Sequence, residues 1–231
     1  MRLVPLNRET HASLRLIRAQ AMEFTETLHI ATLATAEFTD AALAYPIVFA
    51  HNNGRPAPCA LLGLEQGRNQ YLMPDGRWRP HAYVPAAIRM HPFLPTDKGD
   101  GTFDIHIDED FAGWSTTEGE PLFQADGSDT PALTETIDFL ERCVTAMART
   151  GEFVSTLMDL GLLRQDRMQV THPDGTVRSL DEFWAVDEEK LRGLGLADLT
   201  RLHDSGYLGL IHAHLLSLHH MKRLVAELVD G

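Results

Sequence analysis

A short segment near the middle of the chain has the residue types and spacing of metal ligands. In His106-Ile107-Asp108 the imidazole and the carboxylate are two positions apart, and residues with that spacing share one face of a β-strand. A His-x-Asp pair completed by a distant histidine can hold Fe(II) with open positions for oxygen and a co-substrate. The possible distal ligands are His172, His203 and His214. Because the neighbouring positions are acidic, a solvated acidic strand explains the same residues.

A second group of histidines lies at residues 211–220, near the C-terminus. If residues 208–229 form one straight α-helix, only His214 points into the apolar arc of that helix. The opposite, polar arc carries His212, His219, Arg223 and Glu227. No two of these histidines have the i, i+4 spacing of a helical zinc site. We expect His214 to be a buried ring held by hydrogen bonds, with a ligand or a general base as the alternative, and the other histidines to be solvated.

Residues 78–95 (WRPHAYVPAAIRMHPFLP) combine aromatic, proline, arginine and histidine side chains. Four prolines prevent a regular central strand or a long helix, so an ordered irregular connection is expected. Arg89 is expected to be partly buried there, either paired with an internal carboxylate or binding an anionic group of a ligand. The candidate ligand-binding residues are Trp78, Arg89, His91 and His214, and the candidate metal ligands are His106 and Asp108.

The elements that would position these residues change in type near residue 128. Before it, short apolar runs between turns predict antiparallel strands at residues 45–50, 58–64, 70–73 and 101–110. In the last of these, Phe103, Ile105 and Ile107 should face one side.

After residue 128 the apolar residues follow helical spacing. They predict a helix from Pro131 that ends at Gly151, and a second helix over residues 152–160. A hairpin over residues 168–178, a helix capped by Asp187, a short helix at residues 197–203 and the C-terminal helix complete the chain. The predicted fold class is α+β, with a β-rich portion at 1–128 that forms an antiparallel sheet and a mostly helical portion at 129–231 packed on it in one compact domain.

Composition limits the possible partners and compartments. The 231 residues include 33 acidic and 20 basic side chains, and the formal net charge of −13 argues against a nucleic-acid or anionic-membrane surface. No run approaches the roughly 20 apolar residues that span a bilayer, and no signal peptide is visible, so we expect a soluble, cytoplasmic protein that is not a permease. Cys59 and Cys143 are expected to be buried, reduced thiols. Common nucleotide-binding, zinc-protease and nucleophile-elbow motifs are absent.

A set of short motifs, in this order, resembles the SapC family of bacterial proteins. The motifs are VPLNRETH (4–11), YPIVF (45–49), LLGL (61–64), GRNQYL (67–72), DGRW (75–78), YVPAAIRMHPF (83–93), IDED (107–110), GEPLFQADG (119–127) and VDEEKL (186–191). The family often has Arg-Arg-Tyr-Pro-Phe where this chain has Arg-Met-His-Pro-Phe from Arg89. His106 occupies a position that is not regularly histidine in the family, which weakens the Fe(II) hypothesis.

The resemblance implies a protein whose biochemical activity is poorly defined. Family members are associated by name with a bacterial surface layer, and they are often encoded near TonB-dependent receptors, halogenase-like proteins and cupin-like or JmjC-like proteins. The first hypothesis is an accessory protein that binds a small ligand or a protein partner in nutrient-uptake or halogenase-type gene clusters. The alternatives are a non-haem iron oxygenase of the 2-oxoglutarate type and a surface-layer structural protein, so the sequence leaves open whether the protein is an enzyme.

Overall fold

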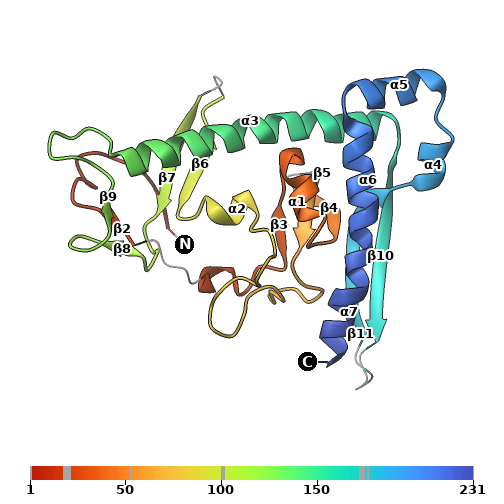
Figure 1. Ribbon diagram of the computed structural model, residues 1–231, viewed down its shortest axis with the longest axis horizontal. Coiled ribbons are helices and arrows are strands. Elements are labelled where there is room, and N and C mark those ends of the chain that lie inside the picture. Colours follow the sequence, from red (N-terminus) through yellow and green to blue (C-terminus); the bar gives the residue numbers. More distant parts are fainter. Residues whose placement is uncertain are drawn as a thin grey trace. The chain divides into compact units, whose positions relative to one another are not determined.

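The structure is a computed structural model (Figure 1) that describes residues 2–17, 22–52, 54–99, 102–171, 175 and 177–230. Its contacts divide the chain into two compact units, each made of two separate stretches. Unit 1 comprises residues 1–20 and 88–145, and unit 2 comprises residues 21–87 and 146–231. Each unit takes residues from both sides of position 128. The expected single compact domain stays a prediction.

Unit 1 contains two small antiparallel sheets. The first has the order β1 (Leu3–Pro5), β7 (Phe103–Asp108) and β6 (Phe93–Asp97), and the second has the order β8 (Trp114–Ser115), β2 (Arg15–Leu16) and β9 (Glu120–Pro121). The alternation predicted for β7 is confirmed, because Ile107 is fully buried in the core and Phe103 and Ile105 pack against it. The core also contains Leu16, Phe93, Leu122, Phe123, Leu133 and Leu140.

Unit 2 is built on a five-stranded antiparallel sheet. Its strand order is β10 (Leu163–Thr171), β11 (Val177–Val186), β4 (Ile47–Asn52), β5 (Arg55–Leu61) and β3 (Ile30–Thr32). Strands β10 and β11 pair as a hairpin that extends beyond the predicted residues 168–178, of which residues 172–174 and 176 lie outside the described part of the chain. The predicted strand at residues 70–73 is wrong, since that segment forms a single bridge between Leu72 and Trp78.

The longest helix passes through a glycine at which the sequence predicts its end. Helix α3 (Pro131–Asp159) runs through Gly151 without a break, so the predicted end at that glycine is wrong. An interior glycine costs only about 1 kcal/mol relative to alanine, and burial of the following Phe153 and Leu157 outweighs it. The helix is terminated near Gly161, where a φ of +61° and the hydrogen bond from Leu162 N–H to Leu157 O form a Schellman motif.

The remaining short helices are α1 (Phe38–Ala41), α2 (Ala86–Arg89), α4 (Glu188–Arg192) and α5 (Leu196–Asp204), with 3₁₀ turns η1 (Glu23–Thr25) and η2 (Thr35–Glu37). The cap predicted at Asp187 is confirmed, because its carboxylate accepts the N–H groups of Glu189 and Lys190 at 3.0 and 3.2 Å. The strands and helices confirm the α+β class. Among the described residues, no helix has both the length and the apolar character needed to cross a bilayer.

The C-terminal segment is not the single straight helix that its hydrophobic pattern predicts. Helix α6 (Tyr207–Ser217) leads into the 3₁₀ turn η3 (Leu218–His220), and α7 (Met221–Asp230) follows. A 3₁₀ turn has 3.0 residues per turn instead of 3.6, so it rotates every later side chain around the axis. Within unit 2, this segment runs alongside the β10–β11 hairpin (Figure 1).

Candidate functional site

The predicted metal ligands lie on β7 but bind different partners. His106 Nδ1 is 3.0 Å from the hydroxyl of Thr96, whereas the buried Asp108 accepts two backbone N–H groups and has one oxygen 3.2 Å from His91 Nε2. Burial raises the pKa of Asp108, but the hydrogen bonds from His91 and from the backbone lower it more, and the net pKa lies below its usual value. Within the described ranges, no group of three or more His, Cys, Asp or Glu could hold a metal ion, and His172 lies outside those ranges.

Arg89 lies at the end of α2 and is exposed, so the expectation of a partly buried guanidinium is wrong. Its guanidinium carbon is 5.0 Å from the centroid of the Phe139 ring, a cation–π contact within unit 1. The neighbouring His91 is half-buried and packs edge-on against Phe111, with 4.9 Å between ring centroids. Ligand binding by Arg89 and His91 stays a prediction.

His214 connects two strands of the sheet in unit 2. Trp184 of β11 pairs with Phe49 of β4, and two residues further along this register Val186 would face Ile47. At this point the His214 ring bonds to the backbone of both strands. Its Nδ1–H donates to Ile47 O at 2.8 Å, and its Nε2 accepts from Val186 N–H at 3.0 Å. Both ring nitrogens are therefore used by the backbone. This arrangement matches the predicted buried ring, and it leaves neither nitrogen for a ligand.

Trp78 belongs to a buried group of aromatic rings. Its indole N–H donates to the Tyr45 hydroxyl at 2.8 Å, and that hydroxyl donates in turn to the Tyr83 carbonyl. The Tyr71 ring packs against both rings, with centroid distances of 4.4 Å to Tyr45 and 6.2 Å to Trp78. Tyr45 and Tyr71 are fully buried and closely packed, so this aromatic group is a fixed surface against which polar side chains can pack.

The turn at Pro74-Asp75-Gly76 brings Arg79 back beside Tyr71. Gly76 has a φ of +77°, which the turn requires, and Arg79 N–H donates to Tyr71 O at 2.8 Å. The guanidinium carbon of Arg79 then lies 5.1 Å from the centroid of the Tyr71 ring. A local turn and a backbone hydrogen bond thus fix the position of this cation.

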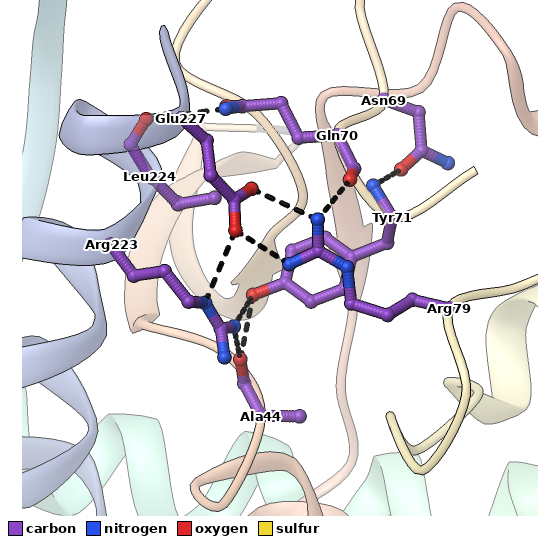
Figure 2. Close-up of polar contacts among 8 residues, drawn as sticks. All are labelled: Ala44, Asn69, Gln70, Tyr71, Arg79, Arg223, Leu224 and Glu227. Carbon is purple, nitrogen blue, oxygen red and sulfur yellow. Dashed lines mark hydrogen bonds and ion pairs between the residues drawn. The ribbon is translucent and has the colours of Figure 1, made fainter. Parts of the chain in front are cut away.

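Arg79 and two residues of α7 meet at this ring (Figure 2). The Arg79 fork holds the Glu227 carboxylate through two hydrogen bonds of 2.7 and 3.0 Å, and it also donates to Gln70 O at 3.2 Å. Arg223 donates to the Tyr71 hydroxyl and to the carbonyl of Ala44, and its Nε is 3.8 Å from Glu227. We call Tyr71, Arg79, Arg223 and Glu227 the Arg79–Arg223 cluster.

The cluster carries two guanidinium groups and one carboxylate, so one positive charge is left in a chain of net charge −13. Its charged side chains are partly open to solvent, with 28 % of Arg79, 38 % of Arg223 and 30 % of Glu227 exposed. The hydrogen bonds with Glu227 raise the pKa of Arg79. Burial raises the pKa of Tyr71 even though Arg223 opposes this effect, so its hydroxyl is protonated at neutral pH.

Sequence reasoning missed most of this site. It selected Trp78, but it placed Arg223 and Glu227 on the polar arc of a helix over residues 208–229 and named neither as a site residue. The η3 turn separates α6 from α7, and no residue in Leu218–His220 is a proline or glycine that would have signalled this turn. His220, expected to be solvated, is half-buried, and its Nε2 is 3.0 Å from Ala42 O.

Comparison with known proteins gives one family. The family model described as SapC matches residues 6–224 of the 231-residue chain. Searches of curated proteins and of solved structures found no match.

Proposed function

The chain belongs to the SapC family, and from this premise we propose that it is an accessory binding protein for a small molecule that carries a carboxylate. The Arg79–Arg223 cluster is the proposed binding site. The proposed setting is the cytoplasm of a bacterium, in gene clusters for nutrient uptake or halogenase-type chemistry. The ligand would approach the partly exposed side chains of Arg79 and Arg223 from solvent.

The observation that carries this proposal is the way in which Arg79 already holds a carboxylate. The two hydrogen bonds to Glu227 have a bidentate, end-on geometry, in which Nη1 and Nη2 of the fork each donate to one carboxylate oxygen, as arginine does when it recognises planar carboxylates. Arg223 is less completely used, because its buried Nε has no hydrogen-bond partner among the described residues and lies 3.8 Å from Glu227. A second carboxylate bound to the exposed part of the Arg223 side chain would balance the remaining positive charge.

The aromatic surface supports binding by holding the cations in place. Both guanidinium groups lie over the face of Tyr71, at 5.1 and 5.4 Å from its centroid, and the Tyr71 hydroxyl is fixed by Ala44 O at 2.6 Å. Groups held in this way lose little conformational entropy when a ligand binds. Tyr71 stays protonated at neutral pH and supplies a hydrogen-bonding hydroxyl, whereas general-base catalysis would require its phenolate.

The test is isothermal titration of the purified protein with acetate, succinate and benzoate. We expect binding of at least one of these carboxylates, and a loss of affinity of about fivefold or more in Arg223→Gln and in Arg79→Gln. Arg77→Gln is the matched control, because Arg77 lies two residues from Arg79 and pairs with Asp75 on the exposed surface.

Two results would contradict the proposal. One is the absence of binding of all three carboxylates at concentrations up to about 10 mM. The other is an equal loss of affinity in the Arg77→Gln control, which would assign the effect to overall charge. Arg223→Lys is a further variant for the case in which glutamine destabilises the fold, since it retains the charge and loses the guanidinium geometry.

A further inference from the structure

A pocket of about 470 Å³ lies elsewhere in unit 2, and it shares no residue with the Arg79–Arg223 cluster. Its walls are the β10–β11 hairpin, the start of α4 and the C-terminal segment from α6 to α7. A volume of this size is within the range that holds small organic ligands in proteins. The chemistry of its lining therefore indicates what kind of molecule would fit.

The floor of the pocket is apolar. It is formed by Phe183, Ala185, Val186, Leu215, Leu218 and Met221. The first three are buried side chains at the end of β11, and the other three are half-buried side chains from α6, η3 and α7. A ligand in this pocket would therefore bury an apolar group of its own against the floor.

The rim carries both signs of charge, and most of its charged groups are already satisfied. Arg164 pairs with Asp166 at 3.0 Å, Arg192 pairs with Glu188 at 3.5 Å, and Asp187 caps α4. Two groups remain, the exposed guanidinium of Arg167 and the exposed carboxylate of Glu189. Among the described residues neither side chain has an ion-pair partner.

From this lining we propose that the pocket binds a free α-amino acid with a large apolar side chain. The carboxylate of the ligand would pair with Arg167, its ammonium group with Glu189, and its side chain would cover the apolar floor. An anion alone would meet four carboxylates at the rim, and a cation alone would meet three guanidinium groups. A zwitterion pairs with both remaining groups and adds no net charge to the rim.

The experiment uses three ligands that differ in one charge each: L-leucine, 4-methylpentanoate, which lacks the amino group, and 3-methylbutan-1-amine, which lacks the carboxylate. Isothermal titration should give binding of leucine that is about fivefold to tenfold tighter than that of either single-charge analogue. Arg167→Gln should weaken leucine and 4-methylpentanoate but leave the amine unchanged. Glu189→Gln should weaken leucine and the amine but leave 4-methylpentanoate unchanged.

Arg201→Gln is the matched control, because Arg201 is an exposed arginine of unit 2 on α5, outside the pocket. Arg167 and Glu189 are themselves exposed, so their variants should fold, and circular dichroism checks this. The proposal is overturned if leucine does not bind at concentrations up to about 10 mM, if 4-methylpentanoate or the amine binds as tightly as leucine, or if Arg201→Gln weakens leucine as much as the two pocket variants do. All of these titrations are carried out in the Arg223→Gln background, so that binding of a ligand's carboxylate at the Arg79–Arg223 cluster does not contribute to the result.

Discussion

Replacing His214 by glutamine should remove a large part of the pH dependence of unfolding between about pH 7.5 and pH 5. The His214 ring is fully buried, and one nitrogen donates to β4 while the other accepts from β11. Only the neutral ring can do both, because protonation turns the acceptor Nε2 into a donor facing the N–H of Val186. Glutamine also offers one donor and one acceptor, but it does not titrate.

The expected magnitude follows from the shift of the His214 pKa. Burial lowers the pKa of His214 from 6.5 to about 4, against a smaller opposite effect of the hydrogen bond to Ile47. Between these two values the unfolded chain binds a proton that the folded protein does not bind, so stability decreases as the pH falls from 6.5 towards 4. The loss amounts to about 2 kcal/mol at pH 5 and to about 3 kcal/mol near pH 4.

The assay is urea unfolding at a series of pH values, followed by far-UV circular dichroism, for the wild type, His214→Gln and His219→Gln. His219 is an exposed histidine of η3 and serves as the control. Because all other titrating groups are shared, the difference in free energy of unfolding between wild type and His214→Gln isolates the buried ring. This difference should fall by about 2 kcal/mol between pH 7.5 and pH 5. Curves that remain parallel over this range would refute the reasoning, as would an equal change in His219→Gln.

Three further predictions concern other positions in the chain. Burial raises the pKa of the Cys59 thiol to about 11, so we expect it to react with Ellman's reagent at pH 8 only when the protein unfolds, and rapid labelling of the folded protein would contradict this. Glu37→Ala removes a buried carboxylate that accepts three hydrogen bonds, and it should lower the free energy of unfolding in urea by about 3 kcal/mol; a change below about 0.5 kcal/mol would count against it. Gly119→Ala should cost about 2 kcal/mol in the same assay, because φ is +89° and the added Cβ would lie 2.5 Å from Leu16 O; unchanged stability would be the contrary result.

Local sequence signals predicted much of the fold. The alternation in residues 103–107 identified β7, the carboxylate at Asp187 identified the start of α4, and the Pro-Asp-Gly turn at residues 74–76 marked the reversal that leads to Arg79. Each of these signals acts over a few residues, through side-chain periodicity, a cap or a restricted backbone dihedral angle. They could therefore be interpreted without knowledge of distant contacts.

The candidate site could not be predicted in the same way, because its residues are far apart in the chain. Tyr71 and Arg79 meet Arg223 and Glu227 across about 150 positions, and no local pattern in either segment indicates that distant contact. The helix end predicted at Gly151 is wrong because burial of the residues that follow this glycine outweighs its local tendency to end a helix. Both errors arise where packing energy exceeds local preference.

By itself, the sequence determined the α+β class and the resemblance to the SapC family that the family match confirms. It also predicted that His214 faces an apolar interior. Only the tertiary structure decided that this ring joins β4 to β11, that Asp108 binds His91 and the backbone, and that two arginines share one carboxylate over Tyr71. The physical reason is that a hydrogen bond or ion pair needs its groups within about 3–4 Å, a condition set by the path of the whole chain.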